Sequence, residues 1–381
     1  MAADVKPSQK LAAYLGRKPV VLALLFLAAI IFFLIVSALS RAFHAQQVAL
    51  ADRWFNRGVN DLKARRYGTA VLDFRSALRY ARDDYSYQLD LAQALMGQGK
   101  TNEAHAYLIN LWDRQPENGF VNLELARIAA QQGETDKALR YYHNAIYATW
   151  PDDQEASRRY TRLELIEYLL KINVKSQAQA ELIALAANIG DKAEQQAQLG
   201  DLFLRTQDDE HALAAYRLSL KSEAHDHRAL AGAGQAAFNL GQYAVAERYL
   251  QEAIAADPKD AASAAQLKTA EDVLLMDPLR RGVPAHQRAR TVMEDFEVSG
   301  SRVKACVTSS SSAPASLQAL VDNWEKMKPR LNESALRRDP DLVEAAMGLV
   351  FAIERQTNTA CGSPTGPDRA LLLIAHLHEG S

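Results

Sequence analysis

The amino-acid sequence predicts an all-α protein: a single transmembrane helix followed by an α-solenoid and a small C-terminal helical domain. The first observation is a run of 22 uncharged, mostly apolar residues near the N-terminus. The second is that apolar and small residues recur every 34 residues between positions 51 and 260, a period typical of stacked helical hairpins. The third is that Ala, Gln, Leu, Arg and Glu dominate long stretches while Gly and Pro fall at spaced intervals, which favours many short helices over a sheet.

The transmembrane helix is predicted at residues 19–40, after a short N-terminal tail at residues 1–18. Arg17, Lys18 and Arg41 bound this segment, and at about 1.5 Å per residue it is long enough for a hydrocarbon core of about 30 Å. It contains no Gly, which argues against a close GxxxG helix pair. A cleaved signal peptide is the alternative, because small residues lie near position 40, but the apolar run exceeds the usual 7 to 15 residues of such peptides.

Basic residues on the two sides of this segment indicate its orientation. Four precede it within the first 18 residues, and three follow within the next twenty. This modest bias favours an N-terminus inside and a body outside. We therefore expect a single-pass protein of the bacterial inner membrane, in contact with the lipid bilayer through residues 19–40 and with its body in the periplasm. Residues 41–50 are predicted to be a linker.

Residues 51–260 are predicted to form about six helical hairpins. The unit at 159–192 lacks a turn glycine and follows an extra segment, Asp153–Arg158, so we interpret it as degenerate. Small residues at fixed positions allow close helix packing, and Leu and aromatic residues fill the space between helices. The first unit carries the pattern in Trp54, Gly58, Leu62, Tyr67, Ala70, Phe74, Ala77 and Leu78.

This pattern resembles the tetratricopeptide repeat (TPR) family. The resemblance implies a concave groove, lined by the first helix of each hairpin, that holds extended or helical segments of partner proteins. Lys63, Arg127, Lys171 and Arg205 could pair with carboxylates of a partner, although charges on a helix face are usually only solvated. The family's clamp for chaperone C-termini is not reproduced, because Val59 stands where its first Asn would be. The implied groove residues are Phe55, Val59, Lys63, Leu89, Gln93, Met96, Leu123, Arg127, Gln131, Glu167, Lys171, Asp201, Arg205, Gln235 and Asn239.

We expect no catalytic residue, metal site, cofactor or nucleic-acid partner. Charged residues make up 24% of the 381 residues and the formal net charge is −2, so charge gives no bias toward nucleic acid. Ala94–Thr101 matches the phosphate-loop pattern, but Gly99 fits the turn inside a hairpin and no strand is expected before it. His225 with His227, and His376 with His378, form HxH pairs that lack further ligands at diagnostic spacing.

The end of the chain is predicted to contain a capping helix at 261–281 and a helical domain at 282–381. Four helices are expected there, beginning near Pro284, Pro314, Asp339 and Arg369, with a loop at Ser309–Ser312. Its two cysteines, Cys306 and Cys361, are the only ones in the chain. They form either a disulfide, as expected in an oxidising compartment, or two buried free thiols.

These observations predict a membrane-anchored scaffold or adaptor that binds partner peptides or proteins in the solenoid groove, in the bacterial cell envelope. One alternative is a cytosol-facing organelle receptor of the import-receptor type. Another is an enzyme or metal-binding protein with its site in the C-terminal domain, which a convergence of His376 and His378 with an acidic ligand would favour.

Overall fold

The computed structural model describes residues 7–150, 153–309 and 314–379, with side chains from residue 22 onward. Within these ranges the chain is helical, and its sole β-type pairing is the isolated bridge between Asn118 and Thr149. The predicted all-α class is confirmed. The chain divides into two compact units, residues 1–165 and 166–381, which are described separately.

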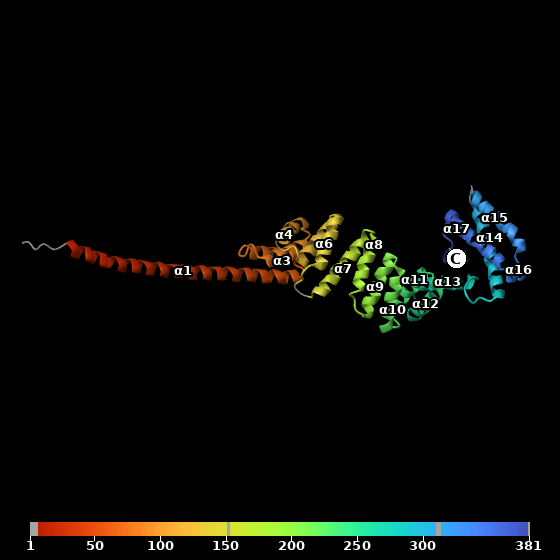
Figure 1. Cartoon of the computed structure of the whole chain (residues 1–381), viewed down its shortest axis with the longest axis horizontal. Helices are drawn as coiled ribbons and strands as arrows, with labels where there is room; N and C mark the ends of the chain where they lie inside the picture. Colours follow the sequence, from red (N-terminus) through yellow and green to blue (C-terminus); the bar gives the residue numbers. More distant parts are fainter. Residues whose placement is uncertain (1–6, 151–152, 310–313, 380–381) are drawn as a thin grey trace, which may run out of the picture. The chain divides into compact units, whose positions relative to one another are not determined.

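Unit 1 begins with a single continuous helix, α1 (Pro7–Lys63), of 57 residues (Figure 1). From Leu22 onward it contains an 18-residue window with a mean hydropathy of 3.1, none of which is buried, so it is long and apolar enough to cross a bilayer. Residues 41–50 also belong to α1, so the prediction of a separate linker is wrong. The physical reason is that this segment holds Ala, Gln, Leu and Arg, which favour helix, and neither Gly nor Pro. Residues 7–18 of the predicted tail are helical too, and residues 1–6 lie outside the described part.

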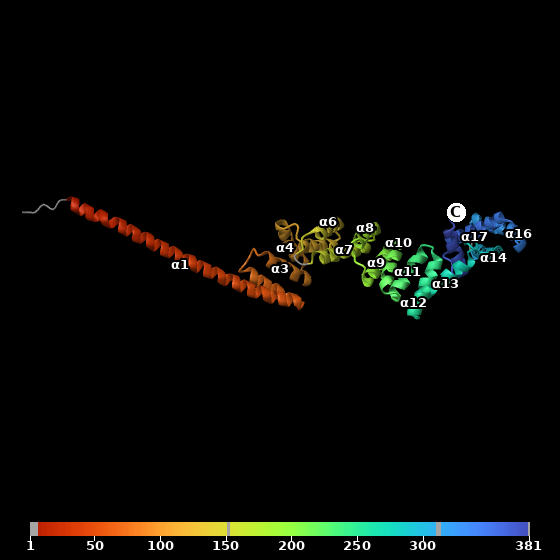
Figure 2. The same ribbon diagram turned by 60° about the horizontal axis from the view of Figure 1, so that its bottom comes forward.

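Antiparallel hairpins follow in unit 1, as Figures 1 and 2 show. The end of α1 pairs with α2 (Tyr67–Leu78), α3 (Tyr85–Gly97) with α4 (Thr101–Arg114), and α5 (Gly119–Gln131) with α6 (Thr135–Tyr147). The next helix, α7 (Gln154–Lys171), begins in unit 1 and ends in unit 2.

Unit 2 continues the repeat with α8 (Lys175–Ala186), α9 (Ala193–Thr206), α10 (Asp209–Ser222), α11 (His227–Asn239) and α12 (Tyr243–Ala256). The predicted capping helix is α13 (Ala261–Met276), which packs on α12 and ends five residues earlier than expected. Asp277 and Pro278 follow it, and the residue before a proline is biased away from helical geometry.

The turn inside each hairpin contains one residue in the left-handed region. Gly99, Gly133 and Gly241 have φ of 80°, 75° and 69°, and three non-glycine residues, Arg65, Asn173 and Gln207, have φ of 58°, 59° and 64°. These positions are 34 residues apart except across the extra segment before α7. The unit interpreted as degenerate therefore turns like the others, with Asn173 in place of glycine, because Asn tolerates this conformation better than most residues.

Close packing between paired helices follows the predicted small residues. A Cβ added to Gly58 would lie 2.6 Å from Phe74, and one added to Gly200 would lie 2.7 Å from Tyr216. On the second helices the recurring alanines are fully buried: Ala70, Ala104, Ala138, Ala178, Ala212 and Ala246.

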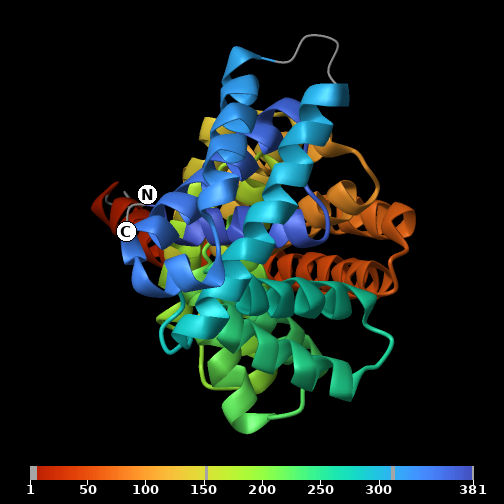
Figure 3. The same ribbon diagram turned by 90° about the vertical axis from the view of Figure 1, so that its right-hand side faces the viewer.

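The C-terminal part of unit 2 contains the four predicted helices, α14 (Ala285–Ser309), α15 (Ala315–Met327), α17 (Pro340–Cys361) and α18 (Pro367–Leu377) (Figure 3). Two further short helices, η1 (Lys328–Arg330) and α16 (Glu333–Arg338), were not predicted because they are too brief to show periodicity. The last helix, α18, packs against both α17 and α13. Of the predicted loop at 309–312, Ser309 ends α14 and the other residues lie outside the described part.

Candidate functional site

The predicted groove residues lie on the first helices of the hairpins, but they do not all face open space. In unit 1, Phe55, Val59 and Met96 are half-buried and pack against the core between the first hairpins. Phe55 also stacks on Tyr87, with ring centroids 4.4 Å apart. These three residues therefore contribute mainly to packing within the repeat.

Three other predicted residues, Gln93, Leu123 and Arg127, line one pocket of about 520 Å³ in unit 1. We call it the α5–α7 pocket. Its wall comes from α3, α5, the segment after α6, and the first turns of α7. The remaining lining residues, which the sequence did not predict, are Phe120, Glu124, Trp150, Ala156, Ser157 and Tyr160.

Arg127 sits in this pocket between two carboxylates of its own unit. Its Nε and Nη2 donate to Glu164 at 2.8 and 2.7 Å, and its Nη1 donates to Glu124 at 2.6 Å. Tyr160 accepts a further hydrogen bond from Nη2 at 3.1 Å. One cation between two carboxylates gives the cluster a formal charge of −1, so Arg127 is not a free cation for a partner's carboxylate.

The pKa directions agree with this geometry. Hydrogen bonding to Glu164 raises the pKa of Arg127 above its usual range, against the effect of burial. Burial raises the pKa of Glu124, and the guanidinium of Arg127 opposes this rise. The pair Arg127–Glu164 links α5 to α7 and fixes one side of the pocket.

An aromatic wall completes the pocket. Phe120 and Trp150 meet edge to face at 5.0 Å, and the indole N–H of Trp150 donates to the carbonyl of Ala145 at 3.0 Å. Gly119 allows this placement, because a Cβ there would lie 2.3 Å from the Trp150 ring. Tyr160 remains 56% exposed. Trp150 is itself buried, so Tyr160 and the half-buried Phe120 are the aromatic surfaces that a partner can reach.

A sequence signal for these missed residues was present in the extra segment before the fourth hairpin. The lengthening makes α7 18 residues long, compared with 12 to 14 in α2, α3, α4, α5 and α6. Its extra turn brings Ala156 and Ser157 to the pocket, and Tyr160 follows directly after this turn on α7.

In unit 2 the predicted groove residues are held mainly by each other and by their neighbours. Both Nη atoms of Arg205 donate to Glu167, at 2.6 and 2.8 Å. Asp201 accepts hydrogen bonds from Tyr216 and Arg228, and Asn239 donates to Asp209 at 2.8 Å. The remaining predicted groove residues come from both units. Lys63, Gln131, Lys171 and Gln235 are exposed, and Leu89 is half-buried.

The phosphate-loop match and the HxH pairs lie in ordinary parts of the helical fold. Gly99 forms the turn between α3 and α4, and a helix rather than a strand precedes it. His227 contacts Asp260 at 3.0 Å, and His378 contacts Asp277 at 3.1 Å, while His376 is exposed. Across the described ranges, no three His, Cys, Asp or Glu side chains gather in a way that could hold a metal ion.

Comparison with known proteins agrees with this arrangement of helices. A family model described as tetratricopeptide repeat matches residues 89–154 and 197–261. The chain contains tetratricopeptide repeats. Among curated proteins, none matches.

Several solved structures match parts of the chain at low identity. PilF of Pseudomonas aeruginosa shares 15% identity over 56% of this chain and 95% of its own, with a TM-score of 0.40. The C-terminal part of a TPR protein from Cytophaga hutchinsonii shares 12% over 81% of this chain and 98% of its own, with a TM-score of 0.44. YrrB, a TPR protein with an unusual peptide-binding site, shares 15% over 50% of this chain and 95% of its own, with a TM-score of 0.40. Such distant likeness says nothing about the partner of this chain.

Proposed function

We propose that this protein is a membrane-anchored scaffold that holds a segment of a partner protein in the α5–α7 pocket. TPR repeats generally mediate protein–protein interactions, which supports a protein partner. The observation that carries the proposal is the pocket itself, where the half-exposed ring of Tyr160 stands beside Phe120 and the aliphatic side chain of Leu123. Concave sites of mostly apolar lining with a few fixed polar groups are the usual form of a recognition site.

The charge of the pocket indicates the chemistry of the partner. Because Glu124 and Glu164 outnumber Arg127, an acidic segment would meet repulsion, while a large apolar side chain flanked by Lys or Arg would be favoured. A cation placed over the face of Tyr160 would add attraction.

Site-specific crosslinking tests this proposal with a matched control. A photo-reactive phenylalanine analogue replaces Tyr160 in one variant and Tyr147 in another; Tyr147 lies on α6, is 73% exposed and does not line the pocket. We expect a discrete crosslinked product from position 160 and not from position 147. Once the partner is purified, Tyr160→Ala should weaken binding roughly tenfold, as for an aromatic anchor, and Tyr147→Ala should not. Equal crosslinking from both positions would reject the pocket as the binding surface.

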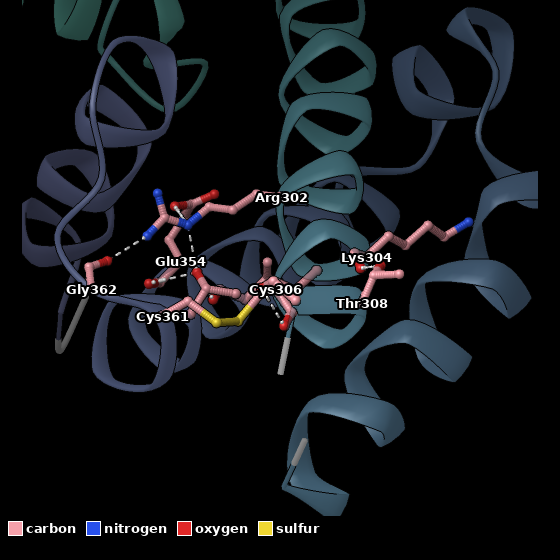
Figure 4. The surroundings of a disulfide bond; sticks show 10 residues. Arg302, Lys304, Cys306, Thr308, Glu354, Cys361 and Gly362 are labelled. Carbon is pink, nitrogen blue, oxygen red and sulfur yellow. Dashed lines mark hydrogen bonds and ion pairs between the residues drawn. A yellow bond between two sulfur atoms is a disulfide. The ribbon is translucent and has the colours of Figure 1, made fainter. Parts of the chain in front are cut away.

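We further propose that α1 remains as the anchor and that the body lies on the oxidising side of a bacterial inner membrane. Two features support this. The apolar part of α1 runs without interruption into the first hairpin, and Cys306 is paired with Cys361 at a Cα–Cα distance of 5.9 Å (Figure 4). Disulfides persist mainly in oxidising compartments.

Membrane topology is tested directly in intact cells and spheroplasts. Mass analysis of the extracted protein should recover residues 1–40, and external protease should reach the repeats only after the outer membrane is opened. Loss of residues 1–40 would indicate a cleaved signal peptide. Protection of the repeats in spheroplasts would indicate a body on the cytosolic side, as in the import-receptor alternative.

A further inference from the structure

The first hairpin places one of its ends toward the membrane-spanning part of α1. The helix α2 runs antiparallel to the end of α1, so its C-terminus returns toward the apolar segment (Figures 1 and 2). Ala51 of α1 is fully buried in a cluster with Ala77, against which Ala81 packs. Residues 79–84, which we call the returning loop, include Ala81 and therefore pass beside Ala51. Ala51 comes about eleven residues after Ser40, or about 16 Å along the helix.

Two arginines at this loop have no ionic partner among the described residues. Arg79 and Arg82 are exposed, and they line a pocket of about 700 Å³ together with Arg75, which is paired with Glu103. Tyr80 stands between them in the chain and is 38% exposed. Arginine beside an interfacial tyrosine is the combination that anchors proteins at the headgroup layer.

Acidic residues also lie at this end of the hairpin, but none forms an ion pair with Arg79 or Arg82 among the described residues. Asp52 accepts a hydrogen bond from the hydroxyl of Tyr87 at 2.6 Å, and Asp84 accepts one from the backbone N–H of Tyr87 at 3.0 Å. Asp83 lines the pocket beside Arg79 and Arg82. Arg53 is also exposed on α1 at this level, so three arginines stand against three carboxylates, two of which already accept hydrogen bonds from Tyr87.

We propose that Arg79 and Arg82 bind the phosphate groups of anionic lipids and hold the first hairpin against the bilayer surface. This inference rests on the proposed anchoring of α1. Headgroups extend roughly 5 to 8 Å beyond the hydrocarbon core. The remaining gap between the headgroups and the level of Ala51 is roughly 8 Å, which is about one Debye length. The length of the arginine side chains and a tilt of α1 can bridge this gap. An acidic protein segment is less favoured than lipid, because the two arginines lie at the end of the hairpin that faces the membrane.

Energy transfer measured on the full-length chain tests this contact. A donor dye is attached at Ser86→Cys, an exposed position in the first turn of α3, and the paired native cysteines do not react. The protein is reconstituted into vesicles of phosphatidylcholine alone or mixed equally with phosphatidylglycerol, each with an acceptor dye on a trace lipid headgroup. The double variant R79Q/R82Q is compared with a control double variant, R65Q/K100Q. The control removes two exposed charges from the opposite ends of the hairpins.

Each arginine near an anionic surface should favour the docked state roughly fivefold, so phosphatidylglycerol should raise the docked-to-undocked ratio about 25-fold through this pair. The double variant R79Q/R82Q should lose this gain and R65Q/K100Q should keep it. Raising the ionic strength from about 0.1 M to about 1 M should also abolish it, because the Debye length falls from about 10 Å to about 3 Å. Equal transfer in both vesicle types, or equal loss in both double variants, would overturn the proposal. A chain that does not enter either vesicle would instead refute the anchoring.

Discussion

At the scale of single residues, Arg127 and Arg205 make similar contacts in different surroundings. The side chains of Arg127 and Glu164 are 29% and 24% exposed, whereas those of Arg205 and Glu167 are 49% and 53% exposed. Half-buried pairs are screened less by water than exposed pairs, and removing one partner leaves the other charge without compensation. The two arginines therefore provide an internal comparison.

We predict that Arg127→Gln lowers the free energy of unfolding by about 2 kcal/mol, because Glu124 and Glu164 then remain as adjacent unpaired carboxylates. Arg205→Gln should cost less than about 1 kcal/mol, as expected for an exposed pair. Urea unfolding of both variants measures the difference. Equal costs for the two substitutions would show that Arg127 does not hold α5 against α7.

Glu354 is a second residue whose surroundings predict a measurable effect, here on the pH dependence of stability. It is fully buried on α17 beside Arg302, whose Nε lies 3.4 Å from a carboxylate oxygen of Glu354 and donates to Thr357 at 2.7 Å (Figure 4). A carboxylate oxygen of Asp368 lies 3.7 Å from Nη1 of Arg302. Burial, reinforced by Asp368 and opposed by Arg302, raises the pKa of Glu354 to about 8.

The sign of the pH dependence follows from this shift. The folded state holds a proton on Glu354 that the unfolded state releases near its ordinary pKa of about 4.3. The contribution of this proton to the free energy of unfolding is therefore fully present below about pH 4.3. It falls by up to about 1.4 kcal/mol per pH unit and is lost as the pH rises through about 8. We predict that Glu354→Gln flattens the stability of unit 2 between pH 5 and 8, measured by urea titrations, while the exposed Glu344→Gln leaves the slope unchanged. An unaltered slope in Glu354→Gln would contradict the assignment.

At the scale of elements, the sequence predicts the repeating hairpins but not the conformation of the turns that lack glycine. The 34-residue period predicts the hairpins because the same packing contact recurs in each unit. The missing glycines at 65, 173 and 207 do not disturb the turns, because the surrounding helix packing imposes the left-handed conformation on Arg65, Asn173 and Gln207. A strained turn can persist where its neighbours determine it.

We predict that Gln207→Gly stabilises unit 2 by about 1 kcal/mol, because a residue with a Cβ pays about this cost in the left-handed region. The reciprocal change, Gly133→Gln, should destabilise unit 1 by a similar amount, since no atom lies within 4 Å of the added Cβ and only backbone strain is tested. Thermal unfolding of both variants gives the two shifts. Shifts of the same sign would rule out backbone strain as their cause.

The candidate site was less predictable than the hairpins. Gln93, Leu123 and Arg127 could be placed on it because groove positions repeat with the period. Trp150 could not, since it belongs to the connection before α7. Tyr160 could not, because it lies just after the extra segment, outside the groove positions carried over from the repeat. The charge of the pocket could not be predicted from the sequence either, because it depends on the contact between Arg127 and Glu164, which belongs to another hairpin. Periodicity predicts contacts that every unit shares and fails for contacts that occur once.

At the scale of the whole molecule, the continuity of α1 has the largest consequence. A helix transmits position rigidly, at about 1.5 Å per residue, whereas a flexible linker would leave the first hairpin free to find any height above the bilayer. In the proposed anchored state, the height of Arg79 and Arg82 above the bilayer is therefore set by the number of residues between Ser40 and Ala51. This property of the chain can be changed without altering any residue of the repeats.

We predict different outcomes for two insertions of equal length after Gln46. Seven helix-forming residues, such as Ala and Glu, should lift the first hairpin by about 10 Å. At an ionic strength of about 0.15 M this exceeds the Debye length of about 8 Å and removes the effect of phosphatidylglycerol on energy transfer from position 86. Seven Gly and Ser residues should let the hairpin fold back onto the headgroups and retain much of that effect. Both insertions should leave crosslinking from position 160 unchanged, because the α5–α7 pocket lies outside the altered segment. If the two insertions behave alike, α1 does not act as a rigid spacer, and the arginines find the bilayer by some route other than the fixed length of this helix.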